Sequence, residues 1–379
     1  MTTTKRQLNA ARSFYFLGGF GFTTWAAIIP FLKQRLAIPD DDLGLLLLCL
    51  GLGALMMMVF AGKIASRYGC RRPLTVAGVL LPLVFLGLCL VPSYMGAVCL
   101  ALLLGALLGL MDVVVNINGI MMERLVKKRI MSGLHALWSL GNFAGAACFS
   151  VLLHFRLSDR VTTLVSSLLI LVLVLYFSPH LMRQSEKSTS ARLHLPRGPI
   201  LMVSLICTLS FLIEGSINDW SGIFMTTEKA VPMSQSSLGL TLFTASVFVV
   251  RLFGDALASH IGARQILLAS LPIACLGFCG LLAGTSPWLL FPCYICIGVG
   301  CANTVPLFYS FLGRQKLVPV TEAIAAVSTI GYAGILVAPA VLGYIASYSS
   351  LYASFALVTA LLAVMYVMVW HITCHREFQ

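Results

Sequence analysis

Charged residues are scarce in this chain of 379 residues: Asp, Glu, Lys and Arg together make up 10% of it, against roughly a quarter in ordinary soluble domains. Among the charged residues the acidic ones are the rarer, with 13 Asp and Glu against 25 Lys and Arg. Hydrophobic residues, by contrast, make up 59% of the sequence. A chain with so few charges and so many apolar side chains is not a soluble globular protein, so we expect it to lie in a membrane.

Motifs of nucleotide-driven and nucleophilic chemistry are also missing. The one Gly-Lys dipeptide, Gly62-Lys63, is followed by Ile, so the sequence has no phosphate-binding loop ending in Gly-Lys-Ser/Thr. It has no Gly-x-Ser-x-Gly nucleophile motif either. His371, Cys374 and His375 are best interpreted as parts of a solvated tail. We therefore expect no enzymatic activity, no cofactor and no metal site.

Long apolar runs dominate what is present, and about twelve of them approach the roughly 20 residues that a membrane-crossing helix needs. The connections between them are short, so any function must reside in a helical bundle. We predict an all-α integral membrane protein. The expected spans are 13–32, 43–62, 73–92, 94–120, 131–153, 161–180, 200–225, 236–257, 265–285, 288–312, 321–346 and 350–371.

The net charge of +12 is distributed unevenly along the chain. With the N-terminus placed inside, the inner connections and tails carry 20 Lys and Arg, among them Arg251 and Arg264, and the outer connections carry 5. An excess of basic residues marks the cytoplasmic side, so we expect both termini in the cytoplasm. Because the basic residues are dispersed over many loops, they do not indicate a nucleic-acid partner.

The longest polar connection, residues 182–199, separates two sets of six spans: residues 1–181 and residues 200–379. The two sets show weak similarity at an offset of 193 residues. The loop beginning at Ser66 and the loop beginning at Ser259 both read Ser-x-x-Gly-x-Arg. The same offset aligns further glycines, namely Gly105 with Gly298 and Gly141 with Gly334. We infer a duplication, a frequent design of transporters.

The segment from Gly62 to Arg72 resembles the signature that the major facilitator superfamily carries between its second and third helices. The resemblance implies two pseudo-symmetric six-helix bundles in a monomeric secondary transporter that works by alternating access. It also implies an inner gate that includes Gly62, Ser66, Arg67, Gly69 and Arg71. The family has Asp where this chain has Ser66 and Ser259, so we expect the gate to be weaker or differently built. Arg251 and Asp255, one helical turn apart, are candidates to replace it.

Two further segments, Ser132 to Gly141 and Glu214 to Trp220, are similar to the fucose-permease-like branch of the superfamily. This resemblance implies a proton-coupled symporter for a sugar-like or related polar solute in the inner membrane of a bacterium. One alternative is proton-driven efflux of drugs or metabolites. A membrane-embedded enzyme or sensor is a more remote alternative.

Acidic residues inside the apolar runs are the strongest functional signal, because an ionisable side chain in a membrane span is costly. Asp112 and Glu214 are therefore the candidate proton-coupling residues. Burial away from water disfavours the ionised form of a carboxyl group, so either acid could take up a proton during transport. Alternatively, the acid has no role in proton transport and only forms hydrogen bonds where two helices pack closely.

Candidate solute-binding residues are amides, an imidazole and indole rings within the spans. His135, Trp138 and Asn142 are spaced by three and four residues, so they share one face of a helix. Together they offer a surface on which a sugar or flat heterocycle could stack. The other candidates are Trp25, Asn116, Asn218 and Asn303.

Overall fold

The computed structural model describes every residue except 1–2, 39, 184–195, 232–237 and 375–379, and the described chain is helical. Twelve of its segments are long and apolar enough to span a membrane, and together they confirm the spans expected from sequence. The helices are α1 (Thr3–Leu36), α2 (Asp40–Tyr68), α3 (Arg71–Leu90), α4 (Tyr94–Val126), α5 (Met131–His154), α6 (Asp159–Phe177), η1 (Ser178–His180), α7 (Pro199–Thr227), α8 (Leu238–Ile261), α9 (Ala263–Ala283), α10 (Pro287–Cys301), α11 (Thr304–Arg314), α12 (Val320–Tyr348) and α13 (Leu351–Cys374).

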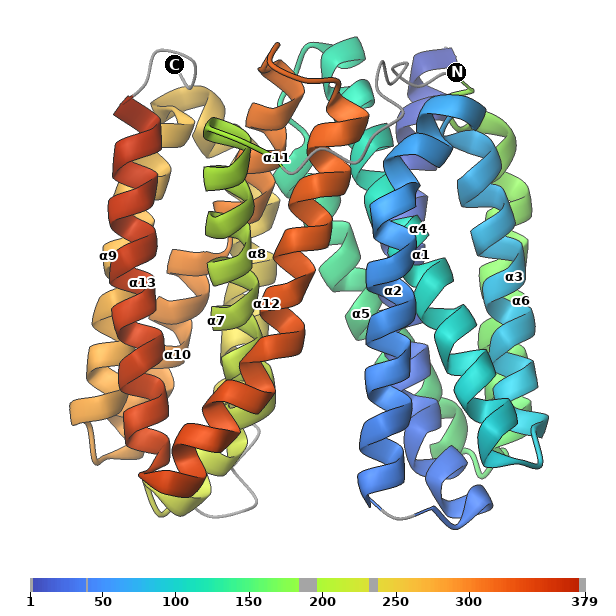
Figure 1. Cartoon of the computed structure of the whole chain (residues 1–379), viewed down its shortest axis with the longest axis horizontal. Coiled ribbons are helices and arrows are strands. Elements are labelled where there is room, and N and C mark those ends of the chain that lie inside the picture. The colour runs from blue at the N-terminus through green and yellow to red at the C-terminus, as the bar shows by residue number, and fades with distance from the viewer. Residues whose placement is uncertain (1–2, 39, 184–195, 232–237, 375–379) are drawn as a thin grey trace. The chain divides into compact units, whose positions relative to one another are not determined.

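The helices group into two compact units, coloured blue to green and yellow-green to red along most of their length in Figure 1. Unit 1 contains residues 1–130, 134–194 and 316–326. Unit 2 contains residues 131–133, 195–315 and 327–379. The first turn of α5 thus belongs to unit 2 and the first turn of α12 to unit 1. Most of the expected linker, 182–199, lies outside the described residues.

Glycines bring helix backbones into direct contact in unit 1. A Cβ atom on Gly105 of α4 would collide with the carbonyl oxygen of Leu50 in α2. A Cβ atom on Gly141 of α5 would collide with the carbonyl oxygen of Phe16 in α1. Small residues of this kind let membrane helices approach closely and gain packing contacts.

Unit 2 repeats both glycine contacts. Gly298 of α10 packs on the Phe243 carbonyl of α8, and Gly334 of α12 packs on the Thr208 carbonyl of α7. Leu50 and Phe243 are 193 residues apart, and Phe16 and Thr208 are 192 apart. The repeat detected in the sequence therefore corresponds to equivalent helix–helix contacts within each unit.

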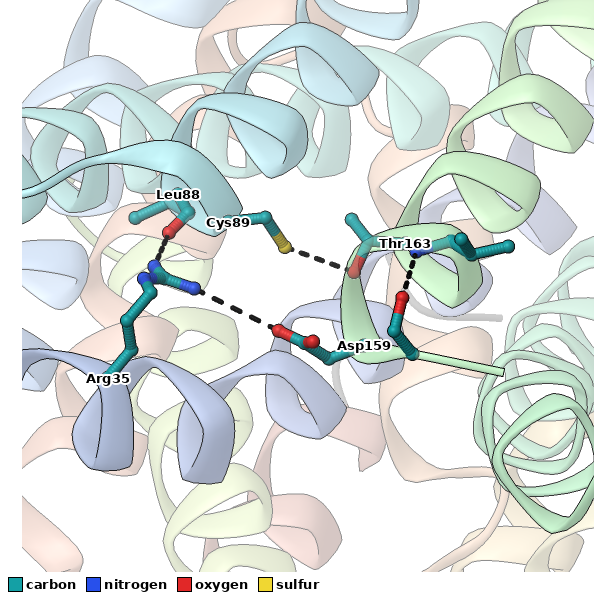
Figure 2. Close-up of polar contacts among 7 residues, drawn as sticks. Arg35, Leu88, Cys89, Asp159 and Thr163 are labelled. Carbon is teal, nitrogen blue, oxygen red and sulfur yellow. Dashed lines mark hydrogen bonds and ion pairs between the residues drawn. The ribbon is translucent and has the colours of Figure 1, made fainter. Parts of the chain in front are cut away.

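A basic side chain near the C-terminal end of α1 holds three helices of unit 1 together (Figure 2). The guanidinium of Arg35 donates to the carbonyl oxygen of Leu88 in α3 and lies 3.9 Å from the Asp159 carboxylate in α6. Beside it, the Cys89 thiol donates to the Thr163 hydroxyl, with 3.1 Å between sulfur and oxygen. We call Arg35, Leu88 and Asp159 the unit 1 clamp.

Unit 2 has an equivalent clamp built from other side chains. The ammonium of Lys229, just beyond α7, donates to the carbonyl oxygens of Leu282 at 3.0 Å and Gly284 at 2.7 Å. It also lies 4.5 Å from the centre of the Tyr352 ring in α13. Arg35 and Lys229 are 194 residues apart. We call these four residues the unit 2 clamp.

The tenth span is interrupted between α10 and α11, at Ala302 and Asn303. Pro306 explains the interruption, because proline has no N–H with which to bond the carbonyl four residues earlier. The carbonyl oxygen of Ala302 is therefore free to accept a hydrogen bond from another helix. The guanidinium Nε of Arg251 in α8 donates that bond, at 2.9 Å.

Candidate functional site

The polar centre of unit 2 is an ion pair between α7 and α8. The Arg251 guanidinium lies 3.3 Å from the Glu214 carboxylate, and it also bonds the Ala302 carbonyl. Arg251 is buried, with 8% of its surface exposed. All three residues lie near the middle of their spans, where an isolated charge is costly. The pair is neutral overall, and the helix interruption supplies a second acceptor for the guanidinium.

The structure corrects the position expected for Arg251. Arg251 lies in the middle of α8 (Leu238–Ile261), away from both helix ends, so it does not belong to an inner connection, and without it the basic asymmetry is 19 to 5. Glu214 is the partner that sequence spacing did not reveal. This ion pair joins a candidate coupling residue to a candidate gating residue.

Asp255, one turn after Arg251, binds the N-terminus of a helix. Its carboxylate accepts hydrogen bonds from the backbone N–H groups of Ser132 at 3.0 Å and Gly133 at 2.7 Å, in the first turn of α5. These residues belong to unit 2 with Asp255. A carboxylate is favoured at this position, because the first N–H groups of a helix lack intrahelical acceptors and carry partial positive charge.

The polar centre of unit 1 is a hydrogen-bonded group around Asn116 of α4, which is 2% exposed. The Tyr15 hydroxyl donates to its side-chain oxygen at 2.8 Å, and its side-chain nitrogen donates to the Asp112 backbone carbonyl at 2.9 Å and to the Asp112 carboxylate at 3.5 Å. The ring of His135 meets the edge of the Tyr15 ring with centroids 5.5 Å apart. Asp112, Asn116 and His135, which lie on two helices, are thus connected through Tyr15.

The other candidates on α5 lie against α1. A Cβ atom on Gly18 would collide with the Trp138 ring, so that ring covers the glycine. The Thr23 hydroxyl donates to the backbone carbonyl of Asn142 at 2.9 Å. Trp25 is packed in unit 1, with 3% of its surface exposed. The three candidates on α5 keep partly exposed side chains, whereas Trp25 does not.

The remaining polar candidates of unit 2 differ in exposure. Asn218 and its neighbour Asp219 on α7 are both exposed within the unit. Asn303, at the interruption between α10 and α11, is 2% exposed. A Cβ atom on Gly254 of α8 would collide with the Asn303 side-chain oxygen, so α8 and the interrupted span are tightly packed there.

The signature segment forms the turn between α2 and α3. Gly69 ends α2 with a φ of 75°, a conformation that glycine adopts without strain. A Cβ atom on Gly62 would collide with the carbonyl oxygen of Thr321 in the first turn of α12, which belongs to unit 1. Ser66, Arg67 and Arg71 line a cavity of about 780 Å³, which we call the basic pocket.

Two elements of these centres escaped sequence reasoning. Tyr15 was not predicted, because the candidate side chains were acids, amides, an imidazole and indole rings, although a phenol within an apolar run can also donate a hydrogen bond. The acceptor at Ala302 was missed because a backbone carbonyl carries no sequence signal of its own. Pro306, four residues later, was the available signal.

Comparison with known proteins agrees with this architecture. The sequence profile of the Major Facilitator Superfamily matches residues 13–314 and 203–376. The chain belongs to the Major Facilitator Superfamily. An uncharacterised MFS-type transporter of Yersinia pestis is 34% identical over 355 residues, covering 93% of this chain and 92% of the relative. This protein is therefore a multi-pass membrane transporter and not an enzyme.

Solved structures of the superfamily share the fold of this MFS transporter. The fucose:proton symporter of E. coli superposes with a TM-score of 0.79 at 14% sequence identity, over 98% of this chain and 99% of the symporter. The human organic anion transporter MFSD10 superposes with a TM-score of 0.78 at 13% identity, over 97% and 100% of the two chains. At these identities, the likeness shows the common fold.

Proposed function

We propose that this transporter moves a small polar solute, sugar-like or a related metabolite, together with a proton. The observation that carries the proposal is the ion pair of Glu214 and Arg251 near the middle of their spans, in which 20% of the Glu214 side chain and 10% of the Arg251 side chain are exposed. An arginine stays charged at every physiological pH, so the carboxylate is the member of the pair that can take up a proton.

Protonation of Glu214 removes the negative charge that balances Arg251. The ion pair between the two helices is then lost, while the hydrogen bond from Arg251 to the Ala302 carbonyl can persist. Loss of the ion pair changes the relative energies of two arrangements of α7, α8 and the interrupted span, so the neutral acid shifts the balance between them. Protonation is in this way linked to the conformational change that transport requires.

Unit 1 supplies the groups suited to holding the solute. His135, Trp138 and Asn142 of α5 are partly exposed, and Asn116 joins them through Tyr15. Ring stacking and amide hydrogen bonds are typical of sites for sugars and similar polar solutes. Asn218 and Asn303 are the candidate amides of unit 2. The shared fold with a fucose:proton symporter is compatible with the same class of solute.

The test is uptake by purified protein in liposomes, measured against a panel of labelled sugars, polyols, nucleosides and organic acids. We expect a solute that accumulates when a pH gradient is imposed, and Glu214→Gln should abolish accumulation while retaining downhill exchange of the solute. Asp112→Asn is the matched variant in unit 1. If Glu214→Gln accumulates solute like the wild type and Asp112→Asn does not, Asp112 is the coupling residue and the role proposed for Glu214 is wrong.

Efflux of anionic metabolites is a second candidate. It is favoured by Arg251, a buried cation that could pair with a solute anion once Glu214 is neutral. The common fold with a human organic anion transporter is compatible with this possibility. The two directions are distinguished in cells, because expression raises the cellular content of an imported solute and lowers that of an exported one.

The proposed location is the inner membrane of a bacterium, with both termini in the cytoplasm. The bacterial relative supports a location in the inner membrane. The distribution of basic residues, 19 inside and 5 outside, supports cytoplasmic termini. A thiol-reactive impermeant label tests it in a variant that lacks the native cysteines. A new cysteine at Lys128 should be protected in intact cells, and one at Arg156 should be labelled.

A further inference from the structure

The basic pocket of unit 1 is a second candidate site, separate from both polar centres. It lies where α2 ends and α3 begins and has a volume of about 780 Å³. Four arginines line it: Arg67 at the end of α2, Arg71 and Arg72 at the start of α3, and Arg183 beyond η1. The fold thus adds the distant Arg183 to three arginines of one turn, and four positive charges meet at one cavity.

The remaining lining of the pocket adds donors for an anion. None of the described residues that line it is acidic, whereas the hydroxyl-bearing Ser66, Thr75 and Ser178 do line it. The first turn of α3, the positive end of a helix dipole, is also part of the wall. Planar guanidinium groups match the geometry of phosphate oxygens, and several of them together favour a phosphate group.

An exposed apolar face begins at the same pocket. Tyr68 and Val76 line it and are 46% and 53% exposed. Along α3 the face continues through Leu80 and Leu83, which are 37% and 57% exposed. Positions 76, 80 and 83 are spaced by four and three residues, so they share one side of the helix. A phosphate bound by the arginines would therefore lie next to a surface suited to acyl chains.

We propose that the basic pocket binds the phosphate head group of an anionic phospholipid, whose acyl chains lie along the exposed face of α3. A cluster of basic residues at the end of membrane helices is a typical site for such head groups. The tyrosine at the rim fits the same depth, because its ring is amphipathic and favours the membrane interface. A soluble phosphate would use the arginines and leave the apolar face without a role.

The α2–α3 turn can be compared with the equivalent turn of unit 2, between α8 and α9. The superfamily signature has Asp at the position of Ser66, and a carboxylate there would neutralise part of the pocket. The equivalent loop of unit 2 offers only His260 and Arg264 as basic residues. The duplication therefore concentrated basic residues in one copy, and we expect lipid binding at the α2–α3 turn and not at the α8–α9 turn.

The test is native mass spectrometry of the full chain released from detergent after incubation with defined lipids. Dioleoyl phosphatidylglycerol is the anionic probe and dioleoyl phosphatidylcholine the zwitterionic control. We expect one retained phosphatidylglycerol per chain, and at least a fivefold lower retained fraction in Arg72→Gln/Arg183→Gln. Lys127→Gln/Lys128→Gln is the matched control, because it removes the same charge from exposed residues outside the pocket. The control should retain lipid like the wild type.

Two additional arms identify the source of the phosphate. Inorganic phosphate in millimolar excess should not displace the lipid, and Val76→Ser/Leu83→Ser should weaken retention about threefold by removing acyl-chain contacts. Equal retention of the two lipids, equal loss in both double charge variants, or displacement by inorganic phosphate alone would overturn the proposal. The last result would assign the pocket to a soluble phosphate. None of these measurements depends on transport, so they are independent of the proposed function.

Discussion

The unit 1 clamp and the unit 2 clamp join equivalent helices through different side chains. In each unit a cation beyond or near the end of the first helix donates to a carbonyl at the end of the third helix, Leu88 in one case and Leu282 in the other. In unit 1 the cation is an arginine facing a carboxylate 3.9 Å away, with 22% of its side chain exposed. In unit 2 Lys229 is 8% exposed and lies over a tyrosine ring. The contact between a cation and a backbone carbonyl thus recurs in the two units, whereas the third partner differs.

The interiors of the two units differ more. Unit 2 holds an ion pair, Glu214 with Arg251. In unit 1, Asn116 is instead hydrogen-bonded to a phenol on α1 and to an acid one turn earlier on α4. An ion pair can be switched by one proton, because protonation of the acid removes half of the pair. A hydrogen-bonded network tolerates protonation with smaller changes. This difference between the two interiors is why we propose Glu214 of unit 2, and not Asp112 of unit 1, as the proton-coupling residue.

Removal of Arg251 should have the largest effect on stability. Arg251→Met leaves Glu214 buried without this counter-charge and the Ala302 carbonyl without its donor, so we expect a loss of about 3–5 kcal/mol in the free energy of unfolding. The measurement is unfolding in detergent. The double variant Arg251→Met/Glu214→Leu should recover most of the loss. Additive losses in the double variant would show that the two side chains do not interact.

The clamps should differ in strength. Lys229→Met removes two hydrogen bonds from a buried ammonium, and we expect it to cost about 2–3 kcal/mol. Arg35→Met removes a more exposed cation and should cost about 1 kcal/mol. Thermal unfolding of both variants under identical conditions checks the order. A larger loss for Arg35→Met would mean that exposure does not decide the strength of these contacts.

The repeated glycine contacts should respond alike to a methyl group. Gly141→Ala and Gly334→Ala each place a Cβ atom against a carbonyl oxygen of the facing helix, and each should cost about 1–3 kcal/mol through overpacking. Gly198→Ala would not serve as a control, because its φ is 57°. Gly215→Ala is suitable, since its nearest neighbour beyond the helix would be 3.9 Å away. Unequal losses at 141 and 334 would show that the two contacts are no longer equivalent.

The smallest effect is expected for Asp159→Asn. The pair with Arg35 is partly exposed and its atoms are 3.9 Å apart, so its loss should cost less than about 1 kcal/mol. The main contact of Arg35, with the Leu88 carbonyl, would persist. A melting temperature indistinguishable from that of Arg35→Met would instead assign most of the unit 1 clamp to the ion pair.

Hydropathy located all twelve spans because the requirement of the bilayer is local: about 20 apolar residues in sequence suffice to meet it. The repeat was detectable for a similar reason, since glycines such as Gly105 and Gly298 cannot gain a side chain without separating helices. Arg251 was misplaced, because a count of charges along the chain does not show that an arginine has an acidic partner on another helix. His135 and Asn116 were both candidates, but Tyr15, which joins them, was not.

The amino-acid sequence alone predicted twelve membrane spans and an internal repeat, and its signature segment resembled a family of transporters. Each of these properties follows from short-range patterns of apolar residues, glycines and basic residues. Which polar groups meet became apparent from the packing of the helices: Arg251 with Glu214 and the Ala302 carbonyl, and Arg183 with the three arginines of the α2–α3 turn. Those pairings depend on how helices distant in sequence rotate and pack against one another. They are important for stability because a polar group within a membrane has no water with which to form hydrogen bonds.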